Sequence, residues 1–439
     1  MTCTVKHMKT PERIGSLLAS ALLLWQVTQF AAHSPEPLQA AASHGRERFV
    51  AAKPQTNPNP RIAQAEPNRW LKLHEQSPSD ELRFHRQEHG GSCMDTRRGR
   101  IVLFGSNTHG KDWSNSPLLF DLAECRWSRL YPDDDKSTYR VNAEGLPVAG
   151  VKGDHPWAMH TFGSVVYDPE RDEMVVCSYP AHLAPGRFTN ALKHVWSRVK
   201  RHPTWTFSFT RNEWRSLPCQ AVHFFPYAAV WDSDRKVIVG YGDGVWELGG
   251  EPRTWKKVFA KALCGWHNNA VYDSKHKAVL VFGSNENSND LIVYRAETRE
   301  HRKMPTPGLR PPKDQHTPMC FDPSTGRTVV LVDRLSGDGS TDAGTTETWL
   351  YDLATDSWQQ LRKAKLSFTC GMNYNFHYDP ANKACLLVAD VPSGSSRNVT
   401  VFALNIDLAG VSAQSASGVR IQEPGGGMMG RQDAGMLER

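Results

Sequence analysis

The chain repeats one hairpin pattern six times, and this repetition constrains its fold more than any other sequence feature. In each copy an apolar stretch ends in Asp, a short polar turn follows, and a second apolar stretch comes after the turn. Asp, Pro, Gly and the basic residues in these turns suit a tight reversal between two strands. The copies read SCMDTRRGRIVLFGS, SVVYDPERDEMVVCS, AAVWDSDRKVIVGYG, NAVYDSKHKAVLVFGS, PMCFDPSTGRTVVLV and NFHYDPANKACLLVA, with marker aspartates Asp95, Asp168, Asp232, Asp273, Asp322 and Asp379. They predict a repeat architecture built from β-hairpins.

Two further apolar stretches follow five of the six hairpins, and the second of them carries an aromatic marker. The marker places hold Trp127, Trp214, Trp255, His301 and Trp358. The sixth hairpin is followed by VTVFALNID alone, but a matching stretch, NRWLKL with Trp70 as its marker, lies near the N-terminus. We therefore predict that this N-terminal strand completes the last repeat, which closes a ring and removes exposed sheet edges.

A hairpin with an Asp-ended first strand and a Trp-bearing fourth strand resembles the kelch repeat, and the resemblance covers residues 68–408. It implies an all-β fold, a β-propeller of kelch-like four-stranded blades that is closed by an N-terminal strand. The glycine pair that usually ends the second kelch strand is reduced here to Phe104-Gly105, Tyr241-Gly242 and Phe282-Gly283. We count six blades, and seven if residues 132–158 or 186–201 contain further strands.

The N-terminal residues have the layout of a secretory signal, because basic residues precede an apolar run over 14–27. That run is shorter than the ~20 apolar residues of a membrane span. We expect a cleaved signal peptide (1–32), a secreted or periplasmic protein and no membrane attachment after cleavage; an uncleaved anchor is the alternative. Residues 33–67 and 409–439 lack apolar periodicity and are predicted to be a disordered linker and a disordered tail around the propeller.

The charge balance suits an anionic partner, since 52 Lys and Arg against 46 Asp and Glu leave a formal net charge of +6. The sequence has no basic block or array of stacking aromatics, so we expect no nucleic acid to bind. The cysteines lack the spacing of a disulfide framework, and several lie in apolar strand-like runs, so we predict buried free thiols. We expect a monomer.

One face of the propeller is predicted to carry the chemistry. In a four-stranded antiparallel blade, the loop before strand one and the loop after strand two lie at the same end. Three of the six copies place a histidine six residues before the marker aspartate, and these are His89, His267 and His316. Neighbouring loop positions on the same face hold His160, His109, Tyr179, Tyr241 and Arg334. The longest insertions also occupy these loops, which is how rigid scaffolds usually present functional groups.

Two enzyme chemistries on propellers can be compared with this set of residues. A copper radical oxidase of the galactose oxidase type needs a Tyr-His dipeptide, which this sequence lacks, so we set copper oxidation aside. Polysaccharide β-elimination fits better, because Tyr, His and Arg can remove the C5 proton of a uronate, neutralise its carboxylate and protonate the leaving O4. The propeller lyases that cleave ulvan are similar to this chain, since two histidines from one blade precede a Tyr and an Arg from the next.

The resemblance implies a secreted polysaccharide lyase that cleaves a uronate-containing, ulvan-like anionic polysaccharide. The catalytic residues that it implies are His89, His109, Tyr179 and Arg198, with Arg187 as the alternative arginine. Tyr179 would shuttle the proton, the arginine would pair with the carboxylate, and the histidines would hold the substrate or assist as base. The expected substrate-binding residues are Tyr241, His160 and His267.

No cofactor is required for this chemistry. Some of the ulvan-cleaving enzymes contain structural zinc, and His and Cys are available here, although no CxxC spacing is present. The question of a metal stays open at the level of the sequence. The alternative function is a non-catalytic kelch propeller that binds a glycan or a protein partner through the same face.

Overall fold

The computed structural model describes residues 58–85, 89–109, 112–222, 228–285, 289–335, 344–372, 374–394 and 396–411. The expected signal peptide (1–32), the first part of the expected linker (33–57) and the expected tail from residue 412 onward lie outside these residues. Across the described ranges, no helix has the length and apolar character needed to cross a membrane.

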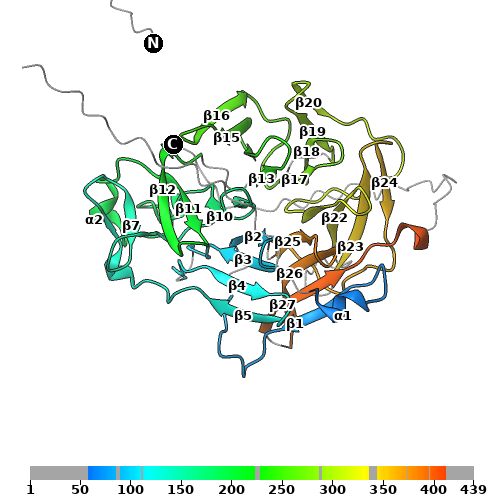
Figure 1. Ribbon diagram of the computed structural model, residues 1–439, viewed down its shortest axis with the longest axis horizontal. Helices are drawn as coiled ribbons and strands as arrows, with labels where there is room; N and C mark the ends of the chain where they lie inside the picture. Colours follow the sequence, from blue (N-terminus) through cyan, green and yellow to red (C-terminus); the bar gives the residue numbers. More distant parts are fainter. Residues whose placement is uncertain are drawn as a thin grey trace, which may run out of the picture. The chain divides into compact units, whose positions relative to one another are not determined.

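Six four-stranded antiparallel sheets make up most of the structure (Figure 1). Blade 1 contains β2 (Gly91–Asp95), β3 (Arg100–Phe104), β4 (Leu118–Asp121) and β5 (Arg126–Arg129). Blade 2 contains β9 (Val165–Asp168), β10 (Glu173–Val176), β11 (Pro203–Ser208) and β12 (Glu213–Gln220). Blade 3 contains β13 (Ala228–Asp232), β14 (Val237–Tyr241), β15 (Val245–Gly249) and β16 (Thr254–Phe259). Blade 4 contains β17 (Asn269–Asp273), β18 (Ala278–Phe282), β19 (Ile292–Arg295) and β20 (Glu300–Lys303). Blade 5 contains β21 (Met319–Asp322), β22 (Arg327–Arg334), β23 (Thr345–Asp352) and β24 (Ser357–Gln360). Blade 6 contains β25 (Tyr374–Asp379), β26 (Ala384–Ser393), β27 (Ser396–Leu404) and β1 (Leu71–Glu75).

The blades form a ring, because the first strand of each contacts the first strands of both neighbours. The order of contacts is β2, β9, β13, β17, β21, β25 and back to β2. These six strands enclose a central channel of about 440 Å³. The predicted all-β propeller with six four-stranded blades is therefore confirmed.

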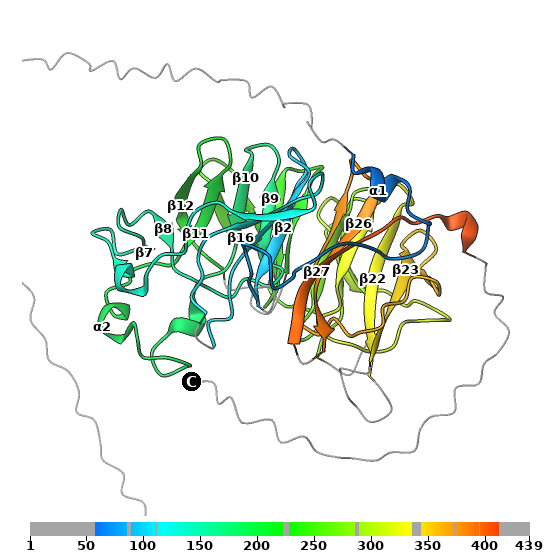
Figure 2. The same cartoon turned by 90° about the horizontal axis from the view of Figure 1, so that it is seen from below.

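The two insertions that could have concealed a seventh blade contain other structures. Residues 132–158 hold a 3-10 turn, η1 (Lys136–Thr138), and a three-stranded sheet of β6 (Arg140–Val141), β7 (Pro147–Ala149) and β8 (His155–Pro156). The segment after β10 holds the 3-10 turn η2 (Ala181–Leu183) and the short helix α2 (Lys193–Trp196). The small sheet and α2 lie side by side at the edge of blade 2 (Figure 2). Their shared core includes Trp113, Trp157 and Val195.

Ring closure by the N-terminal strand is confirmed. Strand β1 is the outer strand of blade 6 and pairs antiparallel with β27, from Leu71 opposite Ala403 to Glu75 opposite Thr400. Leu73, at the centre of β1, is buried in a core shared by blades 1 and 6. The two ends of the folded region therefore share one sheet.

The packed region extends beyond the expected boundaries of 68 and 408. Helix α1 (Pro60–Ala63) is capped by Asn59, whose side-chain amide donates to the Leu122 carbonyl at 2.6 Å. The backbone N–H of Asn59 donates to Asn382 Oδ1 at 2.7 Å, so this residue connects blades 1 and 6. Residues 58–67, which we expected to belong to the linker, are thus packed against the blades. A 3-10 turn, η3 (Leu408–Gly410), follows β27.

The marker aspartates have a structural role in the hairpin turns. The Asp95 carboxylate accepts the backbone N–H of Arg98 at 3.2 Å, and the other five make the same kind of bond within their own turns. The residue four positions after each marker adopts a left-handed backbone with φ between 50° and 66°, at Gly99, Asp172, Lys236, Lys277, Gly326 and Lys383. A side chain that satisfies the turn's N–H groups explains why Asp recurs at this place.

The core lies between adjacent blades, where the Trp markers pack against second strands. The ring of Trp214 in blade 2 lies 4.9 Å from Phe104 in blade 1, and Trp358 in blade 5 lies 5.1 Å from Phe282 in blade 4. Each blade thus supports the position of the loops that its neighbour presents.

Candidate functional site

Four residues that lie two or three positions before a first strand share an unusual backbone conformation. His89, Phe162, His267 and His316 have φ values of 65°, 39°, 64° and 56°. The carbonyl of His267 accepts the N–H of His316 at 2.8 Å, and the carbonyl of His89 accepts that of Thr161 at 3.0 Å. The equivalent positions 226 and 373 lie outside the described residues. Left-handed backbone is costly for such bulky side chains and is often retained at functional sites.

A cluster of four histidines lies where blades 1 and 2 meet. His89 precedes β2, His109 follows β3, His160 lies in the loop before β9, and His182 lies in η2 after β10. The His160 ring centroid lies 4.0 Å from that of His182, and 4.5 Å from those of His89 and His109. His109 and His182 are 4.8 Å apart. Four loops distant in sequence therefore bring their imidazoles into contact.

Burial favours the neutral form of two of these imidazoles, those of His109 and His160. His160 is 2% exposed, and burial, followed by the charges of the neighbouring histidines, lowers its pKa far below the usual value. Burial also lowers the pKa of His109, and the nearby Arg187 guanidinium lowers it further. A neutral imidazole can accept a proton, accept a hydrogen bond or bind a metal ion.

The loop that carries His160 and Phe162 is held by the threonine between them. The Thr161 hydroxyl donates to the Phe104 carbonyl and accepts the Gly91 N–H, both at 2.6 Å. Gly105, with φ 123°, faces this hydroxyl so closely that a Cβ would lie 2.3 Å from it. The glycine that ends the second strand thus allows the loop of blade 2 to reach blade 1.

The Phe162 ring lies between the histidine cluster and a second pair of histidines. Phe162 lines the channel, and its ring lies 5.1 Å from His89 and 5.9 Å from His316. His316 in turn stacks on His267 at 4.0 Å. Burial, followed by the charges of His267 and His89, lowers the pKa of His316 to about 3. His316 of blade 5 thus contacts His267 of blade 4 and lies close enough to His89 of blade 1 for their charges to interact.

The segment after β10 adds an arginine and two aromatic rings to the cluster. The Arg187 guanidinium is near enough to lower the pKa values of His109, His160 and Tyr179. Burial is the larger influence on Tyr179 and raises the pKa of its phenol. The half-exposed Phe188 ring stacks on His109 at 3.9 Å. A cation, a phenol and several imidazoles therefore lie within one another's electrostatic influence.

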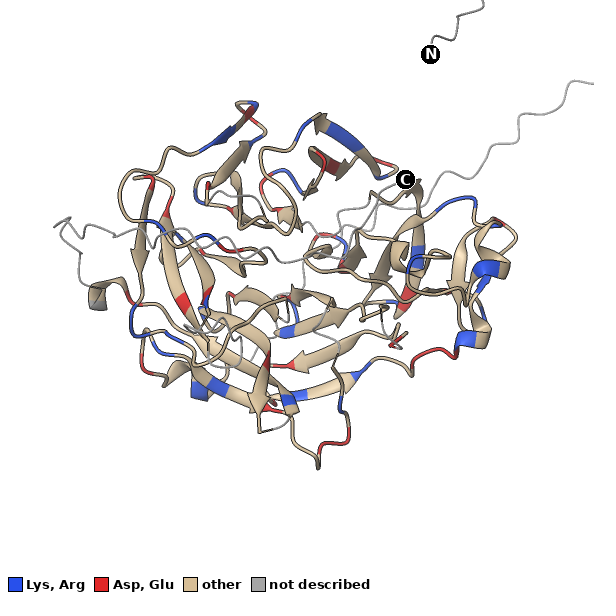
Figure 3. Ribbon diagram, turned by 180° about the vertical axis from the view of Figure 1, so that it is seen from behind, with Lys and Arg blue, Asp and Glu red and all other residues tan. Residues whose placement is uncertain are grey.

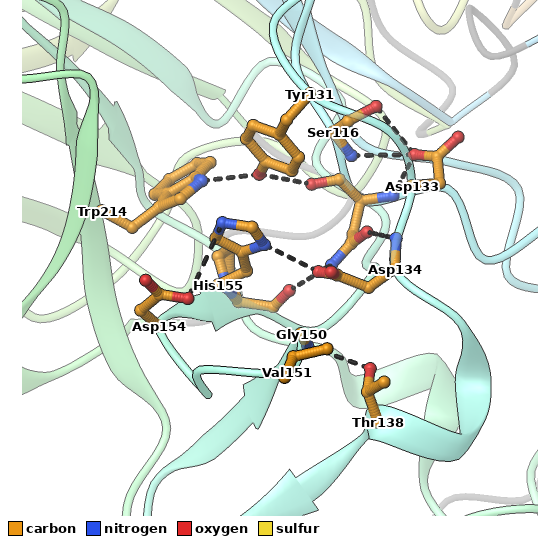
Figure 4. Close-up of polar contacts among 12 residues, drawn as sticks. Ser116, Tyr131, Asp133, Asp134, Thr138, Gly150, Val151, Asp154, His155 and Trp214 are labelled. Atoms are coloured by element: carbon orange, nitrogen blue, oxygen red, sulfur yellow. Dashed lines mark hydrogen bonds and ion pairs between the residues drawn. The ribbon is translucent and has the colours of Figure 1, made fainter.

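A hydrogen-bond network anchors the small sheet to blades 1 and 2 (Figure 4). The Trp214 indole donates to the Tyr131 hydroxyl at 2.6 Å, and that hydroxyl donates to the Asn115 carbonyl at 2.9 Å. The Asn115 side-chain amide donates to Asp134 Oδ2 at 2.8 Å, and His155 Nδ1 lies 2.8 Å from the same oxygen. The insertion is thus fixed to the blades on which the histidine cluster lies.

Comparisons with known proteins establish no family for this chain. No protein-family model matches it, and no curated protein matches it. Among solved structures, the crystal structure of TolB from Acinetobacter baumannii matches with a TM-score of 0.41 and 10% sequence identity. The match covers 69% of this chain and 63% of that one, so the matched part spans less than two thirds of the TolB chain.

The structure separates the two candidate arginines. Arg198 is exposed just after α2, a segment where the ribbon of Figure 3 is coloured blue at several Lys and Arg positions. Arg187, the alternative, is the arginine whose charge reaches His109 and Tyr179. The predicted pair His89 and His109 does come together, with ring centroids 5.0 Å apart.

The three expected substrate-binding residues occupy different environments. His160 is part of the histidine cluster. His267 lies toward the centre of the face, where its Nδ1 is 2.7 Å from Gln315 Oε1. Tyr241 is 1% exposed, and its hydroxyl accepts the Leu263 N–H at 2.8 Å. Its ring fills the core between blades 3 and 4, so it offers no surface for a substrate.

His182 is the member of the cluster that sequence reasoning missed. It follows Tyr179 by three residues in the loop after a second strand, the same kind of loop that placed His109 on this face. That rule could have identified His182 as well. Its contact with His160 depends on how η2 folds back over blade 2, which the repeat pattern does not encode.

Proposed function

We propose that the protein is a polysaccharide lyase that cleaves a uronate-containing, ulvan-like anionic polysaccharide by β-elimination. The observation that carries this proposal is the position of Arg187 within electrostatic reach of both His109 and Tyr179. Elimination at a uronate needs a cation for the carboxylate and a proton-transfer group beside it. The face between blades 1 and 2 offers both.

The proposed reaction assigns a separate task to each group. Arg187 pairs with the substrate carboxylate and stabilises the negative charge that develops when C5 loses its proton. Tyr179, as the phenolate, takes that proton, and the C5–H electrons form the C4–C5 double bond as the C4–O4 bond breaks. Tyr179 then returns the proton to O4. His89 and His109 hold the sugar by hydrogen bonds.

The environment of Tyr179 sets a condition on this role, because it favours the protonated phenol over the phenolate. Burial raises its pKa, while the Arg187 charge acts in the opposite direction. Binding of a uronate would neutralise part of the Arg187 charge, so the tyrosine is most easily ionised before substrate closes the site.

Exposed aromatic rings on the same face provide stacking surfaces for sugar rings. Phe188 is 39% exposed and contacts His109, and Trp266, directly before His267, is 46% exposed. Large apolar side chains left in water beside polar groups are a common feature of ligand sites. The net charge of +6 favours an anionic polymer.

Incubation with a panel of uronate polysaccharides tests the activity, with ultraviolet absorbance reporting the unsaturated product. We expect a rise with at least one uronate polymer and none with a neutral glucan. Tyr179→Phe should lower turnover by ~100-fold or more while binding persists. Tyr272→Phe is the control, because it removes a phenol that donates to Asp234 in a hairpin turn of blade 3.

A binding module on the same face is the second candidate, favoured by the exposed Phe188 and Trp266. Binding of a uronate polymer without cleavage, lost in Arg187→Gln, would replace the lyase with this function. We further propose that the repeats are of the kelch type and that the protein is exported, as the basic residues and apolar run near the N-terminus indicate.

A further inference from the structure

We propose that His109, His160 and His182 bind a divalent transition-metal ion such as Zn²⁺. One ring nitrogen of each lies within 4.8 Å of the corresponding nitrogens of the other two. Imidazole is a preferred ligand of zinc, and three protein ligands with one open position are typical of catalytic zinc sites.

The three histidines come from three separate loops that are held by the surrounding structure. His109 follows β3, Thr161 anchors the loop of His160, and His182 lies in η2, whose Leu183 is buried in the core of the insertion. His160 and His182 are each 2% exposed. Ligands on independently supported segments form a preorganised site.

The protonation state of the cluster suits metal binding. The rings of His160 and His182 stack with their centroids 4.0 Å apart and both residues are 2% exposed, so the two imidazoles cannot both carry a charge. Neutral imidazole is the form that ligates a metal ion. A purely structural role would be met more cheaply by apolar side chains of similar size.

Two features of the site set conditions on binding. Zinc–nitrogen bonds of about 2.0–2.1 Å put tetrahedral ligand nitrogens about 3.4 Å apart, so the rings must move slightly closer together. The Thr108 N–H donates to His160 Nε2 at 3.0 Å. A metal on Nε2 would take the place of this donor, and a metal on Nδ1 would leave the proton on Nε2. Either arrangement gives up the bond to Thr108.

The charge around the site indicates what would occupy the fourth metal position. The three histidines His109, His160 and His182 form a triad without a carboxylate, and the Arg187 guanidinium lies close enough to affect His109 and His160 electrostatically. The positive charge of Arg187 repels the metal cation, but the two charges together attract an anion. If the proposed function holds, the open position would take the uronate carboxylate, and the ion would help to acidify the C5 proton.

Direct metal binding by the full chain tests this site without any polysaccharide. The protein is stripped with a chelator, dialysed and titrated with Zn²⁺ and with Co²⁺. We expect one equivalent of Zn²⁺ per chain and a Co²⁺ visible spectrum of nitrogen and oxygen ligands without thiolate charge transfer. Less than one equivalent, or a thiolate spectrum, would overturn the proposal.

Single-histidine variants locate the ion. His109→Asn changes an exposed residue and should weaken Zn²⁺ binding by at least ~100-fold, and His182→Asn should do the same. His267→Asn is the matched control, because His267 also stacks on a histidine at 4.0 Å but lies outside the triad. Wild-type affinity in the first two variants, with circular dichroism unchanged, would refute the site.

The metal site and the lyase can fail separately. Stoichiometric Zn²⁺ binding without cleavage of any uronate polymer keeps the metal site and refutes the proposed function. Cleavage at the full rate by stripped protein keeps the lyase and refutes a part for the ion in the reaction.

Discussion

Replacement of Leu73 by alanine tests how much the N-terminal strand contributes to the closed ring. Leu73 is 4% exposed at the centre of β1 and packs in a core that includes Leu103 of blade 1 and Val401 of blade 6. Truncating a buried leucine to alanine costs about 2–5 kcal/mol. β1 is the outermost strand of its blade and can relax toward solvent, so we expect a loss of about 2–3 kcal/mol.

The adjacent residue on the same strand provides the control. Lys72 is exposed and its ammonium pairs with Glu75 at 2.6 Å, so Lys72→Ala should change the free energy of unfolding by less than about 0.5 kcal/mol. Urea denaturation followed by circular dichroism measures both variants, with an unchanged slope showing that the folded states are comparable. Equal midpoints for Leu73→Ala and Lys72→Ala would refute the argument that β1 holds the ring closed.

Three further outcomes follow from the fold and the site. Trp70 is only half-buried against Phe376 and Phe402, so Trp70→Ala should lower the free energy of unfolding by about half of the 3–5 kcal/mol expected for a fully buried tryptophan. A shift of the urea midpoint that corresponds to the full loss would contradict this. Arg187→Lys should lower the rate of cleavage of an active uronate polymer by ~10-fold or more, because lysine lacks the planar guanidinium that binds a carboxylate through two hydrogen bonds. Arg198→Lys should leave the rate near wild type, and the reverse ranking would show that Arg198 is the residue that pairs with the substrate carboxylate. Burial lowers the pKa of His316 to about 3 in the folded state, from the 6.5 of an unperturbed histidine, so the stability that depends on its neutral ring is fully present above pH 6.5 and is lost as the pH falls toward 3. The free energy of unfolding should therefore decline from pH 7 to pH 4, and His316→Gln should flatten that decline.

The repeat architecture could be predicted because its signals are local. Each marker aspartate bonds to N–H groups two or three residues later, and the left-handed residue always follows four positions after it, so a hairpin is encoded in a short stretch. Ring closure was predictable for a related reason, since a repeat that lacks one strand requires a matching strand elsewhere, and only NRWLKL carried a marker Trp.

The face that carries the candidate site also followed from the sequence, because strand order alone determines which loops share an end of a blade. His89 and His109 were found in this way, and their rings are in contact. The same rule could not distinguish Arg187 from Arg198, because both lie in one long loop whose path depends on its own packing.

Only the tertiary structure decided which side chains in these loops meet. Tyr241 follows the sequence rule for a residue on the face of the candidate site, but the neighbouring blade buries it and its hydroxyl accepts the Leu263 N–H. His182 was overlooked, yet η2 places its ring against His160. Turns and strand pairs form from residues close in sequence and leave a readable pattern. Contacts among loop side chains depend on how insertions distant in sequence pack on the blades, and a single sequence carries no local signal for that packing.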